Sequence, residues 1–242
     1  MLGNVEISTS PDNKLHLSAR IEGKGSTEEK ARAAAEAAKI NIETGPVIRV
    51  HTDPPAGAAG WEVSIRLQVA VPAGLNISTT NRYGVITVNG LSAESLSLET
   101  SSGEIEVDKF AGALKAKSNS GEIILSEVGG NADIESSNGR ITIRDPGGDV
   151  KAVNRNGGID LDSNSPLNGQ YVLRGDNGEI VFRLPGSSSL KIKAASRNGG
   201  ISGLENIKSQ PGSQSAETSL GSGKGSADLE TRNGHIDVTI RD

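Results

Sequence analysis

The sequence predicts an all-β protein: a parallel β-solenoid with about eight rungs of 18–21 residues, plus one short helix in an N-terminal capping region. The main observation is a glycine followed two residues later by an isoleucine, a pair that recurs eight times. Successive glycines lie 18 to 21 residues apart, except at the last step, where the spacing is 35. The repeat glycines are Gly84, Gly103, Gly121, Gly139, Gly157, Gly178, Gly199 and Gly234, and the repeat isoleucines are Ile86, Ile105, Ile123, Ile141, Ile159, Ile180, Ile201 and Ile236.

Apolar residues two positions apart flank each repeat glycine. They stand seven and five residues before it in most copies, and four residues after it everywhere except at Gly203. Alternation of this kind is typical of a strand with one buried face. Each repeat is therefore predicted to hold two short strands joined by an Asn-Gly or Ser-Gly turn, in which the asparagines are Asn138, Asn156, Asn177, Asn198 and Asn233.

Two architectures fit this pattern. In a solenoid, each repeat is one coil and equivalent strands stack in parallel, whereas in a meander each Asn-Gly closes a tight hairpin. The outward residues favour the solenoid, because Lys115, Asp133 and Lys151 would become lateral neighbours of alternating sign. The near-constant period favours it as well.

The N-terminal region, residues 1–73, is predicted to form two hairpins and one helix that cover the first rung, with a small separate domain as the alternative. Alternation through residues 1–22 indicates strands. Ser26 begins a capping box, and alanines at helical spacing predict a helix over about residues 27–39. Strands follow on either side of a Gly45-Pro46 turn, and after a loop at 53–60 residues 61–71 form the longest strand.

Residues 74–242 are predicted to form the repeat region, and together with the N-terminal region one structural domain. The segment 204–224 interrupts the period. Its Gly, Ser, Gln and Pro content favours an excursion loop over a degenerate coil.

Composition limits the possible partners and compartments. The chain has 242 residues, a net charge of −5 and no cysteine, which excludes disulfides and thiolate metal sites and argues against a nucleic-acid partner. No run of 18 apolar residues is present, so no membrane span is expected in this chain. The first residues show no signal-peptide pattern.

Candidate chemical sites are few. Asp145, Asp149, Asp160 and Asp162 cluster across two rungs, which is the one indication of a polysaccharide-active enzyme, although Asp145 to Asp149 also fits a plain turn. Four arginines precede repeat glycines by two residues and either bind an anionic polymer along one corner or are solvated turn residues: Arg82, Arg155, Arg197 and Arg232. The histidines His16, His51 and His235 form no metal motif, and we expect no catalytic residue, metal or cofactor.

The repeated Ser/Asn-x-Gly-x-Ile-x-Val unit resembles the bacterial putative-adhesin β-strand-repeat family, a domain of unknown function. The segments that carry the resemblance include Thr100 to Val107 and Ser136 to Ile143. The resemblance as a whole covers residues 75–203 and 225–241. The helix near Ser26 and the strand ending in Val71-Pro72-Ala73-Gly74 are also similar to that family's front end. The resemblance implies a β-solenoid in the cell envelope or secreted, and it brings no catalytic residues.

These observations favour a non-enzymatic scaffold or interaction module, adhesin-like, whose partner is a protein or a cell-surface glycan. The alternative is a β-helix lyase or hydrolase that uses the surface acids. A third reading is a spacer that self-associates end to end through its terminal rungs, with Thr231 to Arg241 as the exposed last one.

Overall fold

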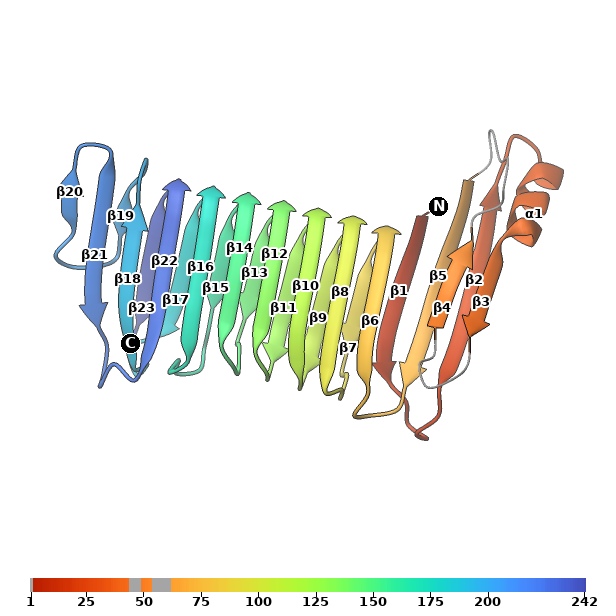
Figure 1. The fold of residues 1–242 in the computed structure, drawn as a ribbon, viewed down its shortest axis with the longest axis horizontal. Helices are drawn as coiled ribbons and strands as arrows, with labels where there is room; N and C mark the ends of the chain where they lie inside the picture. Colours follow the sequence, from red (N-terminus) through yellow and green to blue (C-terminus); the bar gives the residue numbers. More distant parts are fainter. Residues whose placement is uncertain (1, 44–48, 54–61) are drawn as a thin grey trace.

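The computed structural model describes residues 2–43, 49–53 and 62–242. Two long sheets face each other, and a two-stranded hairpin and one helix lie at the N-terminal end (Figure 1). The predicted Gly45-Pro46 turn, the loop after Asp53 and the residue Trp61 lie outside the described residues.

The 10-stranded sheet carries the first strand of every coil. In spatial order its strands are β20 (Lys208–Gln210), β21 (Ser213–Ser219), β18 (Leu190–Ser196), β22 (Gly225–Asn233), β16 (Gln170–Asn177), β14 (Val150–Asn156), β12 (Ala132–Asn138), β10 (Ala113–Ser120), β8 (Ser95–Ser102) and β6 (Asn76–Tyr83).

The 11-stranded sheet carries the second strand of every coil and continues into the N-terminal region. Its order is β19 (Ile201–Ser202), β23 (Ile236–Arg241), β17 (Ile180–Pro185), β15 (Ile159–Asp162), β13 (Ile141–Arg144), β11 (Ile123–Val128), β9 (Ile105–Phe110), β7 (Ile86–Asn89), β1 (Leu2–Thr9), β5 (Glu62–Val71) and β2 (His16–Lys24).

Equivalent strands of neighbouring coils pair in parallel, which confirms the solenoid and excludes the meander. Ala132 of β12, for example, pairs with Leu114 of β10 on one side and Val150 of β14 on the other. The Asn-Gly step after β12 does not close a hairpin, because β12 belongs to one sheet and β13, which begins at Ile141, belongs to the other. Each turn therefore carries the chain across the core.

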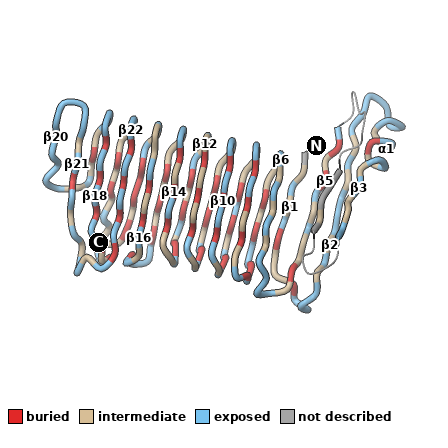
Figure 2. Tube along the Cα trace, in the orientation of Figure 1, coloured by how far each residue is buried: buried red, intermediate tan, exposed pale blue. Residues whose placement is uncertain are grey.

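The core lies between the two sheets as stacked ladders of aliphatic side chains. The repeat isoleucines are at most 6% exposed, and each pairs in register with the next, as Ile123 does with Ile105 and Ile141. Figure 2 shows buried and exposed positions alternating along these strands. Because every coil presents apolar residues at the same inward positions, one coil can stack on any other.

The repeat glycines are required by the close approach of successive turns. A β-carbon on Gly139 would lie 2.1 Å from the carbonyl oxygen of Gly121, and the φ angle of Gly139 is +141°. No side chain fits there without moving the backbone. The glycines therefore allow the coils to stack at strand spacing, in addition to making the turns.

The coils do not stack in sequence order. The last coil, β22 with β23, lies between β16–β17 and β18–β19, since β22 pairs with β16 at Leu173↔Leu229 and with β18 at Ala194↔Leu229. The expectation that Thr231 to Arg241 forms the exposed terminal rung is therefore wrong. Glu230 of β22 lies in register with Arg174 of β16, and Asp228 of β22 lies in register with Lys193 of β18, so the inserted position gives both cations an acidic lateral neighbour.

The segment 204–224 is a strand-containing excursion, and its expected loop character is wrong for its central part. β21 pairs antiparallel with β18 over Ser196↔Gln214 to Lys191↔Ser219, and β20 pairs antiparallel with the start of β21. The hairpin satisfies the free backbone groups of β18, which would otherwise be an edge strand.

The N-terminal region contains one of the two predicted hairpins. β3 (Lys39–Glu43) and β4 (Arg49–Asp53) pair antiparallel, but β1 and β2 are not hairpin partners, because β5 lies between them. β1 also pairs in parallel with β7 and so joins this region to the first coil. Long-range pairing with β5 overrides the local proximity of β1 and β2.

The one helix among the described residues, α1 (Glu28–Ala37), is shorter than predicted. It begins after Thr27 rather than Ser26, because the Thr27 hydroxyl accepts the hydrogen bond from the Lys30 backbone N–H at 3.3 Å. Its buried residue, Ala34, packs in a small cluster with Val63 and Ile65 of β5.

Candidate functional site

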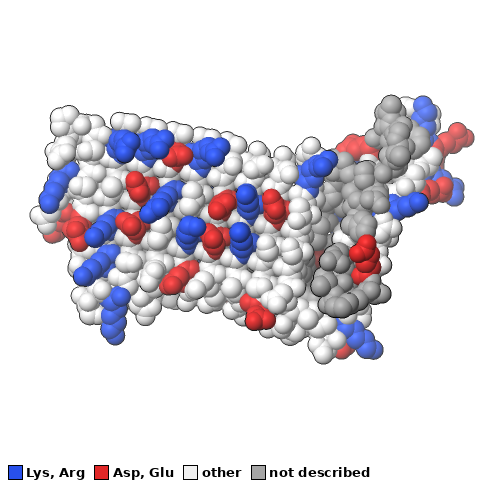
Figure 3. Space-filling view, in the orientation of Figure 1, with Lys and Arg blue, Asp and Glu red and all other residues white. Residues whose placement is uncertain are grey.

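A transverse groove crosses the outer face of the 10-stranded sheet and is the strongest candidate site. It has a volume of about 920 Å³ and passes over seven adjacent strands, from β10 to β21. This face is toward the viewer in Figure 3, which shows Lys and Arg side chains among acidic ones across it. The groove runs across the strands, along the long axis of the solenoid.

Each of the seven strands contributes three consecutive residues to the transverse groove, at the same repeat positions in six strands and at the residues paired with them in the antiparallel β21. The first and third residues point outward and form two walls, while the middle residue points inward and leaves its backbone as the floor. The first wall contains Lys117, Glu135, Val153, Arg174, Glu230, Ala195 and Ser215. The second wall contains Asn119, Ser137, Arg155, Asp176, Arg232, Arg197 and Ser213.

The floor is fixed from below by buried polar side chains that bind the repeat glycines. Asn154 Nδ2 donates to the Gly139 carbonyl at 2.7 Å, and Ser196 and Thr231 donate to the Gly234 and Gly178 carbonyls at 2.8 and 3.1 Å. These bonds connect one coil to the next, so they hold the floor backbone in register. The groove is thus built on rigid sheet rather than on loops.

A ladder of asparagines follows the second wall. Four asparagines each donate a side-chain Nδ2–H to the Oδ1 of the asparagine in the neighbouring coil, at 2.8 to 3.0 Å: Asn156, Asn177, Asn233 and Asn198. Asn138 begins the ladder by accepting from Asn156. The ladder follows the spatial order of the coils, with Asn233 between Asn177 and Asn198. It fixes the turn in which the second wall stands.

Most charges in the transverse groove lie in opposite-sign pairs, whereas Arg197 and Arg232 are neighbouring cations on the second wall. Lys117 faces Glu135 at 3.8 Å, Arg174 faces Glu230 at 3.9 Å, and Arg232 faces Asp176 at 3.7 Å. These exposed pairs contribute little stability, on the order of 0–1 kcal/mol each. Within the described part of the chain, the guanidinium groups of Arg155 and Arg197 have no ion-pair partner.

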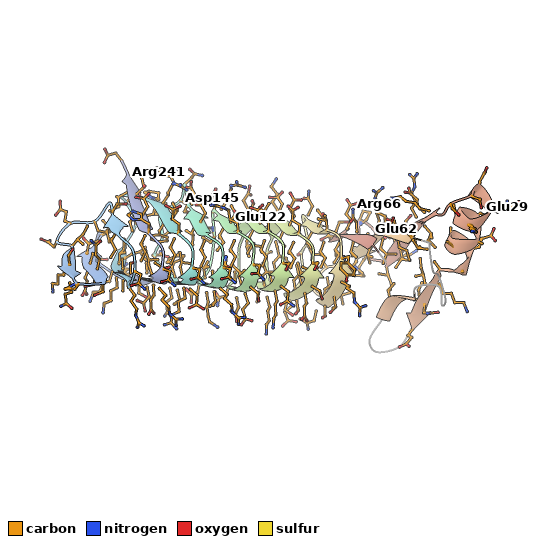
Figure 4. The ribbon with its side chains drawn as sticks, turned by 90° about the horizontal axis from the view of Figure 1, so that it is seen from above. Glu29, Glu62, Arg66, Glu122, Asp145 and Arg241 are labelled. Carbon is orange, nitrogen blue, oxygen red and sulfur yellow. The ribbon has the colours of Figure 1, made fainter. Side chains whose placement is uncertain are left out.

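The four candidate acids do not converge on a catalytic pair. Asp160 binds Arg183 at 2.8 Å, and Asp162 binds Arg241. Asp145 accepts hydrogen bonds from the backbone and side-chain nitrogens of Asn164 at 2.6 and 3.1 Å. Figure 4 shows Asp145 and Arg241 on the side of the 11-stranded sheet, away from the groove.

Asp149 has a structural role of its own at the start of the next coil. Its Oδ1 accepts a hydrogen bond from the backbone N–H of Gln170 at 2.9 Å. The next residue is Tyr171, and burial raises the pKa of its phenol group. All four acids are therefore engaged in holding turns or neighbouring strands together.

The described histidine side chains, His16 and His235, and Asp12, a carboxyl group with a lowered pKa, lie apart from the groove floor. His16 Nε2 contacts Asp12 at 2.7 Å, and this bond, with one from Ser10, lowers the pKa of Asp12 to about 2. His235 Nε2 contacts Ser202 Oγ at 2.8 Å, and the His51 side chain lies outside the description. Among described residues, no three His, Asp or Glu side chains are arranged to hold a metal ion.

The repeat region matches a known family over residues 75–240, described as Toastrack DUF4097. The chain belongs to the Toastrack DUF4097 family. This membership confirms the resemblance drawn from the repeat, namely a β-solenoid domain of unknown function. The Toastrack match begins at Leu75, close to the predicted start of the repeat region.

Two further comparisons add little to this. No curated protein matches the chain. A solved structure of a putative cell adhesion protein from Clostridium sporogenes covers 99% of this chain and 89% of its own, at 15% identity and a TM-score of 0.30. So low a TM-score carries no argument about this protein.

The arginines of the sequence repeat mark part of the transverse groove. Of the four arginines singled out by the repeat, Arg155, Arg197 and Arg232 line it, whereas Arg82 on the edge strand β6 does not. The repeat arginines did not indicate the first wall or the contribution of β21, including Gln214. The position four before each repeat glycine could have indicated the first wall, but the pairing of β21 with β18 has no counterpart in the repeat.

Proposed function

We propose that this protein is a non-enzymatic interaction module, adhesin-like, which is exported or exposed at the cell envelope and binds its partner along the transverse groove. The observation that carries the proposal is the groove itself. It presents one three-residue pattern on six adjacent strands and continues onto β21, which makes a repeating surface suited to an extended partner. The rigid floor supports a preformed site.

The engaged acids support a binding role over hydrolysis. A glycoside hydrolase needs two carboxyl groups separated by about 5–9.5 Å across a bound sugar, one of them free to donate a proton. Here Asp160 and Asp162 are bound to arginines, and Asp145 and Asp149 hold backbone N–H groups. The lyase or hydrolase alternative has no free acid pair at this cluster.

Location at the envelope rests on the family resemblance rather than on the fold. The described residues contain no helix with the length and apolar character needed to cross a bilayer. The partner classes that fit the proposal are a cell-surface glycan or an extended protein segment.

The test is a binding screen of the purified protein against isolated cell-wall fractions and a glycan array, followed by size analysis of every bound polymer. Saturable binding without shortened products supports the proposal. Release of shortened products would instead establish an enzyme, and absence of binding to any envelope fraction would remove the adhesin-like function.

A further inference from the structure

The transverse groove is basic in a protein that is acidic as a whole. Its lining includes five basic side chains and three acidic ones, a local balance of +2, whereas the chain carries −5. All three acids are already paired with neighbouring cations, so the uncompensated charge belongs to Arg155 and Arg197. Both stand on the second wall and are exposed.

The two free arginines are separated along the groove rather than adjacent. Arg155 belongs to β14, and Arg197 comes directly after the last residue of β18, with β16 and β22 between the two strands. Three strand steps place them roughly 14 Å apart at the usual spacing. A single small anion cannot reach both, but a chain with anionic groups along its length can. The whole groove extends over six strand steps, roughly 29 Å.

The lining also excludes several other partners. It contains no aromatic residue, so it offers no stacking platform for nucleobases or for the faces of neutral sugars. It crosses the strands over the middle of the sheet, where backbone groups are already paired, so a peptide cannot add as a further strand. Arginine instead suits carboxylate and phosphate groups, which it can bind through two parallel hydrogen bonds.

We infer that the transverse groove binds a linear anionic polymer, a glycan or polyol chain whose carboxylate or phosphate groups recur along its length, with Arg155 and Arg197 as the two anchoring cations. This inference rests on the proposed function and names the ligand class. The paired cations Lys117, Arg174 and Arg232 contribute where an anionic group of the polymer displaces their present partners. Because the contacts are exposed, binding weakens as salt rises.

The test compares three proteins in equilibrium binding to polygalacturonate, polyphosphate and neutral dextran. The proteins are the unmodified chain, the variant Arg155→Gln with Arg197→Gln, and a control, Lys115→Gln with Lys191→Gln. The control makes the same change in net charge on the same sheet face, and both of its lysines are exposed and lie outside the groove. All four side chains are exposed, so thermal unfolding is expected to be unchanged.

We expect the unmodified protein to bind at least one polyanion and not dextran. The arginine variant should bind about tenfold more weakly, as expected for two exposed charge contacts, and the control should change less than about twofold. Binding only to polygalacturonate or only to polyphosphate supports the inference and identifies the anionic group.

Three outcomes would overturn the inference. Equal weakening by the two double variants would show attraction by net charge without a site. Binding to dextran in preference to both polyanions would show another ligand class. Binding to cell-wall fractions but to neither polyanion would leave the proposed function standing and remove this inference alone.

Discussion

At the scale of single residues, the repeat glycines determine how closely the coils can stack. If a β-carbon were built on any of them except Gly84, it would lie 1.8 to 2.1 Å from the carbonyl oxygen of the repeat glycine in an adjacent coil. A β-carbon on Gly84 would lie 2.1 Å from the carbonyl oxygen of Gly3 in β1. The buried polar residue three positions earlier then binds that same carbonyl in several coils, as Asn154 does with Gly139. Steric access and hydrogen bonding therefore converge on one atom.

We predict that Gly139→Ala destabilises the protein by about 2–4 kcal/mol, because the new β-carbon clashes with the Gly121 carbonyl and the positive φ is unfavourable for alanine. The control is Gly129→Ala, whose β-carbon would meet nothing closer than 3.6 Å, and for which a change within about 0.5 kcal/mol is expected. The midpoint of urea unfolding measures both. Equal stability of the two variants would contradict the tight stacking of the turns.

At the scale of elements, the most informative feature is the position of β22 and β23 between strands that precede them in the sequence. β22 lies between β16 and β18, and β23 lies between β17 and β19. Arg174 of β16 lies against Glu230 of β22 at 3.9 Å, and Lys193 of β18 lies in register with Asp228 of β22. Sequential stacking would instead place Val172 beside Lys193 and Arg174 beside Ala195. The inserted order thus gives Arg174 and Lys193 acidic neighbours that sequential stacking would not provide.

The inserted order can be tested by cross-linking, because the chain has no native cysteine. Val172 pairs directly with Asp228, so Val172→Cys with Asp228→Cys should oxidise to a disulfide, since Cα atoms one strand apart lie about 4.8 Å from each other. The control pair, Val172→Cys with Lys193→Cys, is two strands apart, roughly 10 Å, beyond disulfide reach.

Peptide mapping by mass spectrometry would identify the cross-linked peptides. A bond in the control pair and none in the first pair would show that the coils stack in chain order.

At the scale of the whole molecule, the two sheets end differently. The 10-stranded sheet is closed at one end by the β20–β21 hairpin and ends at the other in β6. The 11-stranded sheet continues past the first coil through β1, β5 and β2. We propose that residues 1–73 act as a cap on that side, as their sequence indicated. Exposed sheet edges promote association with other chains, so such coverings keep a solenoid discrete.

We predict that the β20–β21 hairpin prevents self-association. Replacing residues 205–219 by a short Gly-Ser linker would uncover β18, whose Leu190, Ile192 and Ala194 alternate with outward residues, and we expect concentration-dependent oligomers in sedimentation velocity. The control replaces the exposed residues 205–207 alone, which leaves β21 in place and should stay monomeric. A monomeric hairpin deletion would show that this edge needs no cover.

The repeat by itself determined the solenoid, its isoleucine ladders and the Asn-Gly turns, because these depend on spacings within one coil and on the alternation of buried side chains. Only the tertiary structure decided the order of the coils, the pairing of β21 with β18 and the transverse groove. The physical reason is that all coils present nearly the same inward surface, so Ile236 fits beside Ile180 as well as Ile201 would. The choice among equivalent neighbours depends on pairings across the whole sheet, and the groove exists only once seven strands lie side by side.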